Sequence, residues 1–277
     1  MYLELDIYYD PDRIGSEFDS VASKRFRLFS KEICLYDLLM GFWERSANEA
    51  MTQFIAGSGK QGDILELGTG TGHLLSLLAE HFSQSKIASV DYSEKMIEVA
   101  TQYLLRNNPQ THIISGCQHY ESSTCIDPHV KFIHCNCFDL PNGKQKYDLI
   151  VSSFLFDIQT PPKLNKLLAE CACLIKNEGS IFIAVLDDAI CHSYMKWFSR
   201  NYFLLTNRIY KFCYRSELLR RISQQFFSGY YTHCRPVNIE QYIENIPDIK
   251  ISRRTVSSIK ILGIPFLPVK IVEVVKV

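Results

Sequence analysis

Hydrophobic residues recur at helical spacing over the first part of the chain. A first pattern runs from Phe18 to Phe29, and a second runs from about Ile33 to Ile55. The Gly57-Ser58-Gly59 cluster then ends the helical pattern, because glycines and serines break helices. These features predict an N-terminal helical cap over residues 1–60.

From Asp63 the pattern changes, and short apolar runs typical of buried strands alternate with amphipathic stretches typical of helices. This alternation favours right-handed crossovers and a parallel sheet with helices on both faces. We therefore expect an α/β fold, a Rossmann-like, doubly wound and mostly parallel sheet, with its cofactor-binding core over residues 61–187. The expected strands are 64–67, 87–90, 130–134, 149–152 and 181–186, and the expected helices are 74–82, one capped by Ser93, and 164–175, closed near Asn177-Glu178-Gly179.

Two connections are longer than a minimal α/β unit needs. Residues 106–129 lengthen the link before the Val130 strand, and Thr111–Ser115 within them could be a strand or a loop. Residues 188–247 are too long for a simple connection, and positions 194–231 hold 12 aromatic residues in 38. We expect residues 188–247 to form a helical lid insert whose aromatic side chains pack on the sheet and, in part, face a pocket.

The last segment, residues 248–277, has the alternation of a β-hairpin. Lys250–Leu262 and Val269–Val277 are β-like, and Gly263–Pro268 between them is typical of a turn. Such a hairpin would complete the core sheet with antiparallel strands at one edge.

Composition and charge narrow the class of protein. The chain has 277 residues, of which 47% are hydrophobic and 12% aromatic, and its 30 basic and 30 acidic side chains balance. These values exclude a disordered chain and provide no bulk basic field for a nucleic-acid partner. The acidic start does not have the features of a secretory signal, and no apolar stretch approaches the ~18 residues of a spanning helix.

The ten cysteines of this mid-sized chain are expected to be reduced thiols. A single residue separates the thiols in Cys135/Cys137 and in Cys171/Cys173, whereas structural zinc sites usually have two to four residues between cysteines. We therefore expect no metal site and a reducing, cytoplasmic setting.

A glycine-rich turn, Glu66-Leu67-Gly68-Thr69-Gly70-Thr71-Gly72, follows the first strand and opens a helix. Glycines there let the backbone turn sharply and let a ligand approach main-chain atoms. The GxGxG spacing departs from the GxGxxG of dinucleotide sites, and no phosphate-loop lysine follows, which favours a ligand that is not strongly anionic. Asp91 ends the next strand 19 residues after Gly72, where a carboxylate can accept hydrogen bonds from both ribose hydroxyls.

This combination resembles the cofactor site of class I S-adenosylmethionine-dependent methyltransferases. The resemblance extends over residues 62–187. Cys135–Pro141 is similar to the family's segment after the third core strand, Lys146–Val151 to the entry of the fourth, and Leu174–Gly179 to the turn before the fifth. Asn136 stands where an aspartate is usual, which keeps a carbonyl acceptor and loses a charge, and Asn177-Glu178-Gly179 departs from the usual Pro-Gly-Gly of a turn.

The resemblance implies a role for each residue around the turn. Glu66, Gly68 and Gly70 would line the methionine end of S-adenosyl-L-methionine, and Asp91 would hold its ribose. Tyr92 and Met96 would flank the adenine, and Asn136 would meet its amino group with Cys137 beside it. The remaining expected cofactor-binding residues are Thr69 and Gly72 in the turn and Ser153 after the fourth strand.

A weaker similarity concerns the flanks. Phe18–Ala22 and Tyr36–Met40 resemble the N-terminal helices of ubiquinone/menaquinone-biosynthesis C-methyltransferases. The glycine turn departs from the Asp-x-Ala-Gly-Gly-Thr-Gly of that subfamily. The quinone link is therefore a lead about the acceptor and not an assignment.

Methyl transfer from a sulfonium is an in-line displacement in which the protein mainly supplies alignment and a dry site. A base is needed only when the acceptor must lose a proton. Candidates lie where the carboxyl ends of the strands open, although each aspartate there could equally be a helix cap or a solvated loop charge. The candidate catalytic residues are Asp157, Asp187 and His192, and the candidate substrate-binding residues are Phe154, Phe156, Asp188, Trp197 and Tyr202.

The sequence thus favours an S-adenosylmethionine-dependent methyltransferase that transfers a methyl group to an O, N or C atom of a small, partly apolar, aromatic or quinone-like acceptor. The alternative is a catalytically weak S-adenosylmethionine-binding scaffold or regulatory protein, because no unambiguous base stands out. A nicotinamide oxidoreductase is disfavoured by GxGxG. Nucleic acid is not an expected partner, and the oligomeric state is open.

Overall fold

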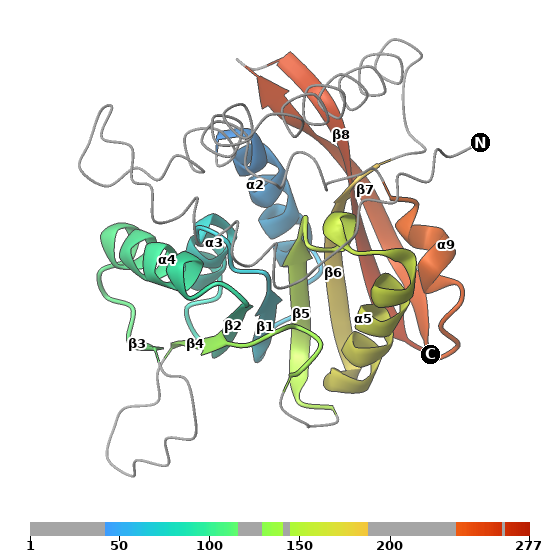
Figure 1. The fold of residues 1–277 in the computed structure, drawn as a ribbon, viewed down its shortest axis with the longest axis horizontal. Helices are drawn as coiled ribbons and strands as arrows, with labels where there is room; N and C mark the ends of the chain where they lie inside the picture. Colours follow the sequence, from blue (N-terminus) through green and yellow to red (C-terminus); the bar gives the residue numbers. More distant parts are fainter. Residues whose placement is uncertain (1–41, 116–128, 141–144, 188–236, 262–263) are drawn as a thin grey trace, which may run out of the picture.

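The computed structural model describes residues 42–115, 129–140, 145–187, 237–261 and 264–277, and these form one sheet with helices on both faces (Figure 1). The expected helices before residue 42 and most of the expected lid insert, residues 188–236, lie outside the described residues. No helix in the described ranges is long and apolar enough to cross a membrane.

Within these ranges the strands form an 8-stranded sheet in the order β3-β4-β2-β1-β5-β6-β8-β7. The strands from β3 to β6 pair in parallel, whereas β8 pairs antiparallel with both β6 and β7. This confirms the doubly wound, mostly parallel sheet with a C-terminal antiparallel hairpin. The bounds are β1 Ile64–Leu67, β2 Ile87–Asp91, β3 Ile113–Ser115, β4 Val130–His134, β5 Tyr147–Ser153, β6 Ile175–Leu186, β7 Ile249–Ile261 and β8 Ile264–Lys276.

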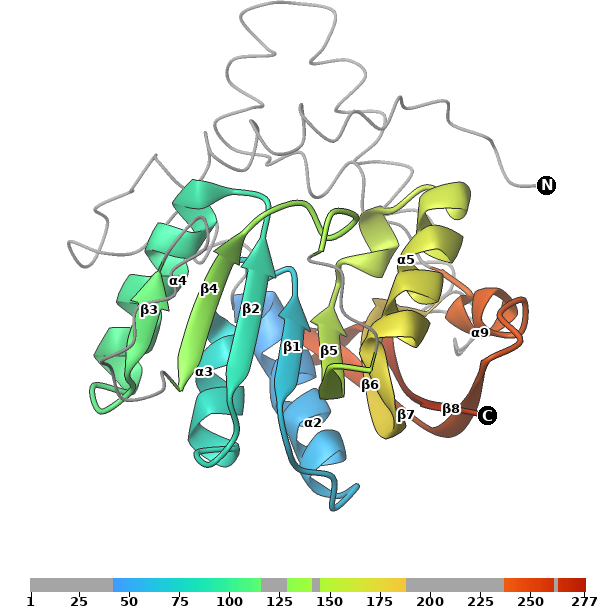
Figure 2. The same ribbon diagram turned by 90° about the horizontal axis from the view of Figure 1, so that it is seen from below.

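Helices cover the sheet on two sides (Figure 2). One side carries α2 (Phe42–Ala56), α3 (His73–His81) and α4 (Glu94–Asn107), and the other carries α5 (Pro161–Leu174) and α9 (Ile239–Ile243). A short 3-10 helix, η2 (Phe156–Ile158), follows β5. The central strands are apolar on both faces, as a parallel sheet covered by helices requires.

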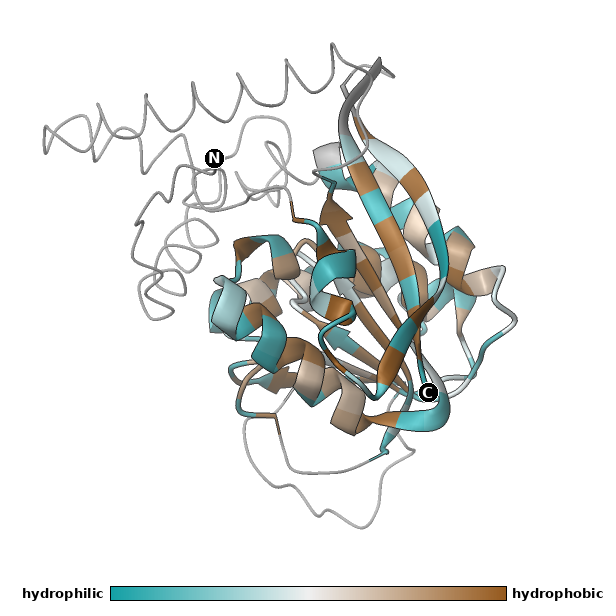
Figure 3. Cartoon of the chain, turned by 90° about the vertical axis from the view of Figure 1, so that its right-hand side faces the viewer, coloured by the Kyte–Doolittle hydropathy of each residue, from teal (hydrophilic) through white to brown (hydrophobic). Residues whose placement is uncertain are grey.

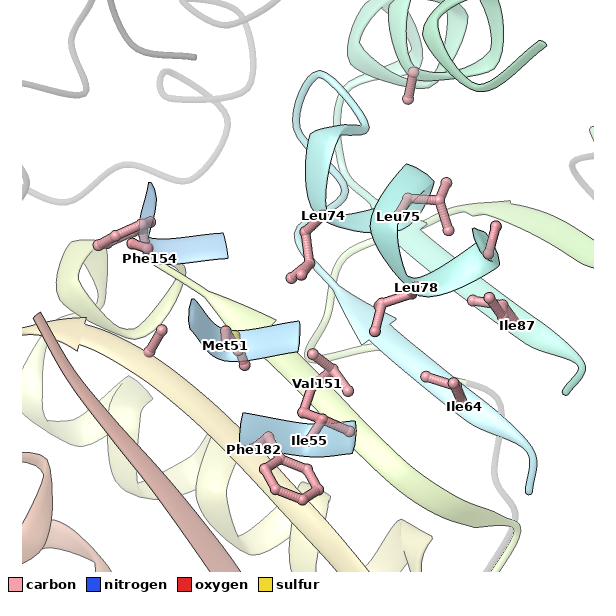
Figure 4. Packing of buried hydrophobic residues seen from close by; sticks show 14 of the residues in the cluster. Met51, Ile55, Ile64, Leu74, Leu75, Leu78, Ile87, Val151, Phe154 and Phe182 are labelled. Atoms are coloured by element: carbon pink, nitrogen blue, oxygen red, sulfur yellow. The ribbon is translucent and has the colours of Figure 1, made fainter. Parts of the chain in front are cut away.

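The larger apolar cluster joins α2 and α3 to the centre of the sheet (Figure 4). Met51 and Ile55 of α2 and Leu75 of α3 are fully buried in it. Burying each such side chain stabilises the fold by about 1.5–3 kcal/mol. Truncation of Leu75 to alanine is therefore expected to cost roughly 2–5 kcal/mol.

Two helix starts explain how the chain turns at the carboxyl edge of the sheet. Ser93 caps α4 as expected, because its Oγ accepts a hydrogen bond from the Met96 amide at 3.2 Å. Gly72 precedes α3 with φ 85°, and a Cβ there would lie 2.8 Å from the Ala100 Cα. Glycine at this position therefore permits both the left-handed backbone and the close approach of α3 to α4.

The hairpin turn differs from the sequence expectation. We expected the turn over 263–268, but β8 already begins at Ile264, so Pro265 and Pro268 lie within a strand. Proline cannot donate to a ladder. The pairing with β6 begins only at Val269, so among the described strands both prolines lie where β8 pairs with β7 alone, a position that tolerates proline.

The entry to β6 is a second correction. Helix α5 ends at Leu174, and Asn177-Glu178-Gly179 belongs to an irregular start of β6 instead of a turn. The pairing with β5 shifts there, and a Cβ at Gly179 would lie 2.7 Å from the Asp148 carbonyl oxygen. The undecided Thr111–Ser115 stretch contains the short edge strand β3.

Polar and apolar residues are interspersed along the outer strand β7 (Figure 3). On β7 the basic residue Arg253 pairs with the buried Glu273 of β8 through Nε at 2.5 Å. Its guanidinium also lies over the Phe54 ring of α2, 4.7 Å from the centroid. These contacts fasten α2 to the hairpin, and charged side chains on β7 disfavour pairing with another sheet.

Candidate functional site

The glycine turn lies at the carboxyl end of β1, where the chain order of the sheet reverses. From β1 the chain proceeds to β2 on one side and later to β5 on the other. Ligands of open α/β sheets bind at such a switch point, outside the carboxyl ends of the strands. The amides of Gly68 and Thr69 donate to the Val90 carbonyl at 2.9 and 3.1 Å, which ties the turn to the end of β2.

Asp91 holds the turn through its carboxylate. Its Oδ2 accepts from the Gly70 amide and its Oδ1 from the Ser93 amide, both at 2.8 Å. These two bonds orient the carboxylate at the edge of the turn. A Cβ at Gly70 would meet no atom of the described residues within 4 Å, so these residues leave space beside the turn.

Glu66 lies beneath the turn and is buried. The Ser89 hydroxyl donates to Glu66 Oε2 at 2.5 Å, and Thr69 Oγ1 contacts Ser89 Oγ. Burial raises the pKa of Glu66 to about 8, partly offset by the Ser89 hydrogen bond and reinforced by the charge of Asp91. The carboxyl is therefore protonated at neutral pH, and its Oε1 has no partner among the described residues.

The end of β4 places Asn136 and Cys137 beside Asp91. Asn136 Oδ1 accepts from the Phe138 amide at 3.1 Å. Burial, with a further contribution from the Asp91 charge, raises the pKa of Cys137 to about 12, so the thiol is neutral. Tyr92 is 41% exposed at the same edge, whereas Met96 is buried in the core, with 2% of its surface exposed.

The end of β5 reaches the same edge of the sheet. Ser152 pairs with Leu67, so Ser153 is level with Gly68. The next residue, Phe154, has φ 57°, a left-handed backbone that is uncommon for a bulky side chain and often marks functional sites. Phe154 and Phe156 are both buried in the apolar clusters.

Asp157 and Asp187, two of the catalytic candidates, are buried and engaged in contacts with the fold. Asp157 Oδ2 accepts from the Leu186 amide at 2.9 Å, which joins η2 to the end of β6. Asp187 Oδ1 lies 3.2 Å from the buried Lys270 Nζ, which is also 3.6 Å from Glu240 Oε1. The remaining candidates, Asp188, His192, Trp197 and Tyr202, lie outside the described residues.

Sequence reasoning missed three polar residues at this edge. Ser89 binds Glu66, and Asn48 of α2 lies between Ser153 and His73. Ser89 could have been found, because it precedes Asp91 by two positions and so faces the same side of β2. His73 follows the last glycine of the turn directly, but nothing in the pattern around Asn48 distinguishes it from other polar residues of a helix.

The strand order, the glycine turn after β1 and the aspartate after β2 define a Rossmann-like protein with the features of a nucleoside-binding edge. A family model described as "Methyltransferase domain" matches residues 58–206, more than half of the chain. The chain belongs to this methyltransferase-domain family, and the resemblance found in the sequence is confirmed at this level.

Individual relatives are distant. The chain is 25% identical over 166 residues to a malonyl-[acyl-carrier protein] O-methyltransferase of Anoxybacillus flavithermus. The match covers 59% of this chain and 53% of the relative, so the chain spans about half of that protein's length. Magnesium protoporphyrin IX methyltransferase of Synechocystis PCC 6803 has a similar structure, with a TM-score of 0.61, 14% identity and coverage of 97% and 100%. The 1,6-didemethyltoxoflavin-N1-methyltransferase of Burkholderia thailandensis has a TM-score of 0.57, 12% identity and coverage of 100% and 98%. At these identities the structural neighbours establish the fold alone.

Proposed function

We propose that this protein is an S-adenosylmethionine-dependent methyltransferase. The observation that carries the proposal is the Asp91 carboxylate, which two backbone amides hold at 2.8 Å beside a glycine turn with open space at Gly70. The Synechocystis neighbour was crystallised with S-adenosylmethionine and with S-adenosylhomocysteine, and the Burkholderia neighbour with S-adenosylhomocysteine. These structures support the same cofactor class here.

The residues present fit this cofactor chemically. Asp91 lies after β2, where a carboxylate can accept hydrogen bonds from ribose hydroxyls, and Tyr92 beside it is 41% exposed, as an aromatic ring that meets a base would be. Glu66 is protonated, so the wall under the turn adds no second full charge. When bound, S-adenosylmethionine supplies a methyl group already activated on a sulfonium. The chain's own residues bind and orient the nucleoside and keep the glycine turn open.

For the acceptor, we propose a small, partly apolar or aromatic molecule that is methylated at O, N or C. The Synechocystis and Burkholderia proteins act, by name, on a porphyrin and on a toxoflavin precursor, and both are planar conjugated molecules. The aromatic-rich stretch at 194–231 is consistent with such an acceptor. The Anoxybacillus relative acts, by name, on a malonyl group carried by a protein, so an acyl acceptor is the alternative within this class.

If the acceptor must lose a proton, Asp157, Asp187 and His192 are the proposed bases. The two aspartates are buried and engaged with Leu186 and Lys270, and a base in either position would have to exchange one of these contacts. This observation also favours a second candidate function, a scaffold or regulator that binds S-adenosylmethionine without turnover.

Calorimetric titration of the full chain with S-adenosylmethionine and S-adenosylhomocysteine tests the main proposal, with NADH as the control for an oxidoreductase. We expect micromolar binding of both adenosyl compounds and none of NADH. Failure to bind either adenosyl compound would overturn the proposal. Incubation with S-adenosylmethionine and metabolite extracts, followed by mass spectrometry, then separates enzyme from scaffold, because only an enzyme forms S-adenosylhomocysteine together with a methylated product.

A further inference from the structure

A chain of polar side chains crosses the carboxyl edge of the sheet and joins four elements. The Ser153 hydroxyl at the end of β5 donates to Asn48 Oδ1 of α2 at 2.7 Å. Asn48 Nδ2 lies 3.4 Å from Nδ1 of His73, the first residue of α3. The His73 ring meets the Tyr103 ring of α4 edge to face, with centroids 6.1 Å apart.

With the Asn48 amide in the orientation that the structure has, the donors and acceptors of this chain follow one arrangement. The amide group of Asn48 has its NH₂ toward His73, and an NH₂ group can only donate. His73 Nδ1 must therefore be the acceptor and carry no proton, which places the ring proton on Nε2. Because Asn48 Oδ1 faces Ser153, the single hydroxyl proton of Ser153 is committed to Asn48.

Burial and nearby charge keep this arrangement in place. Asn48 is buried, with 4% of its surface exposed, so turning its amide over would require the His73 proton to move to Nδ1 and Ser153 to become an acceptor from Asn48. Burial and, to a lesser degree, the charge of Arg45 lower the pKa of His73 to about 4. The ring is therefore neutral over the physiological range, and Nδ1 stays available to Asn48.

This arrangement has a consequence for Ser153 and its place in the site. A serine whose proton is already donated offers only lone pairs to any further partner. Ser153 is half-buried and level with Gly68, on the side of the turn that would meet the methionine end of the cofactor. A group that approaches Ser153 from the site must then bring its own N–H.

We propose that Asn48 is a positioning residue that sets Ser153 as a hydrogen-bond acceptor for the ammonium group of the bound cofactor. The inference rests on the proposed function, since it names one part of that site. Asn48 touches neither the cofactor nor the acceptor and acts through the Ser153 hydroxyl. Its replacement changes which group Ser153 can bind, and not the shape of the nucleoside end of the site.

The test compares two ligands that differ at the group in question. S-adenosylhomocysteine has the ammonium, and 5′-methylthioadenosine lacks the whole amino-acid end. We expect Ser153→Ala to lower the affinity for S-adenosylhomocysteine about 10-fold and Asn48→Leu to lower it about 5-fold. The affinity for 5′-methylthioadenosine should be unchanged in both variants. Asn48→Asp retains an acceptor for Ser153 and is the matched control, expected to bind S-adenosylhomocysteine within about 2-fold of the native protein.

The double variant, Asn48→Leu with Ser153→Ala, is expected to bind no more weakly than Ser153→Ala alone, because both changes remove the same bond. Equal weakening of both ligands by Asn48→Leu would assign Asn48 a purely structural role and overturn the proposal. Unchanged binding of S-adenosylhomocysteine in Asn48→Leu or Ser153→Ala would also overturn it.

A measurement without ligand separates this inference from the proposed function. Nitrogen-15 NMR of the His73 ring reports which nitrogen has the proton. The native protein is expected to show the Nε2–H form, and Asn48→Asp is expected to move a proton to Nδ1. If the native protein binds neither nucleoside, the proposed function fails. A native Nδ1–H form overturns the Asn48 arrangement itself.

Discussion

Asp91 and Asp148 lie at opposite ends of the sheet, and each accepts a hydrogen bond from a backbone amide at a glycine-containing bend. Asp91 at the end of β2 accepts from the Gly70 amide at 2.8 Å. Asp148 near the start of β5 accepts through Oδ2 from the Asp63 amide, next to Gly62, also at 2.8 Å. The two ends differ in what surrounds the carboxylate.

The Asp148 end is filled by the chain itself. Lys176 Nζ donates to the same Oδ2 at 2.8 Å. A Cβ at Gly62 would lie 2.4 Å from Asp148 Cγ, so no room is left between the bend and the carboxylate. At the Asp91 end, the part of the chain that the structure describes places no atom within 4 Å of a Cβ at Gly70. The same local chemistry therefore has two roles. At one end Asp148, the Asp63 amide and Lys176 form a purely structural contact, called the clasp below, and at the other end the turn with Asp91 is a candidate binding site.

The acids at the two ends also differ in charge state. At the clasp, burial alone would raise the pKa of Asp148, but the bonds from Lys176 and the Asp63 amide outweigh it and the pKa is lowered. At the turn, burial dominates and raises the pKa of Glu66 to about 8. Lys176 therefore helps to keep Asp148 ionised, whereas burial keeps Glu66 neutral.

The two bends are expected to respond differently to the addition of one methyl group. Gly62 has φ 124° and faces Asp148, so Gly62→Ala should cost about 3–4 kcal/mol of unfolding free energy through strain and displacement of the clasp. Gly70 has φ 53° and open space, so Gly70→Ala should cost only about 1 kcal/mol. Urea unfolding of both variants measures this difference.

The comparison fails if the two variants lose similar stability. Gly70→Ala should also weaken S-adenosylhomocysteine in calorimetry, because its methyl group occupies the open space that the ligand needs. Folded Gly62→Ala protein should bind it normally.

Removal of the two carboxylates should affect ligand affinity at the Asp91 end and stability at the Asp148 end. Asp91→Ala is expected to weaken S-adenosylmethionine about 100-fold, since two hydrogen bonds to a charged acceptor are lost. Asp148→Ala should leave the affinity of the folded protein unchanged and lower the urea midpoint. Calorimetry at a temperature where both variants remain folded makes the measurement, and normal binding by Asp91→Ala would contradict the assignment of the site.

The raised pKa of Glu66 predicts a pH dependence of stability. The folded state holds a proton on Glu66 up to about pH 8, whereas the unfolded chain releases it near 4.5. Stability from this group is therefore complete below pH 4.5 and is lost as the pH rises toward 8. Glu66→Gln removes the proton exchange, so the free energy of unfolding of the variant relative to native should rise by roughly 3–4 kcal/mol between pH 5 and 8.

Urea unfolding of both proteins at several pH values makes this measurement. Glu273→Gln is an unsuitable control because Arg253 pairs with that carboxylate, whereas Glu98→Gln changes only an exposed pair. A flat difference between Glu66→Gln and native would mean that Glu66 is ionised in the fold.

The smallest effect is expected at the cation of the clasp. Lys176 is 39% exposed, so its ion pair with Asp148 is partly screened by solvent. Lys176→Ala should lower the urea midpoint only slightly, and less at high salt, with no change in nucleoside affinity. A loss of affinity would mean that the two ends of the sheet are coupled.

Elements whose signal is local could be predicted from the sequence. The runs at 64–67 and 130–134 form strands with these same bounds, and Ser93 caps α4, because strand burial and capping depend on a few neighbouring residues. The hairpin turn was misplaced because Pro265 and Pro268 are typical of a turn by local propensity. Only the place where β6 starts to pair with β8 makes room for them in a strand.

The site residues also divide into those with a local sequence signal and those that only the fold brings together. The glycine turn and Asp91 were found because their spacing is fixed by one βαβ unit. Asn48 was missed because it meets Ser153 across 105 positions and His73 across 25. Asp157 and Asp187 looked alike in sequence as acids after strands, and only the fold gives one the Leu186 amide and the other Lys270.

By itself, the sequence determined the order of strands and helices, the glycine turn with its aspartate, and the methyltransferase family. These depend on periodicity and short spacing, which the covalent chain sets directly. The tertiary structure alone decided which polar atoms are already satisfied, which acids are ionised, and which end of the sheet is filled. Those properties depend on burial and on partners from distant segments, because the free energy of a polar group is set by everything that replaces water around it.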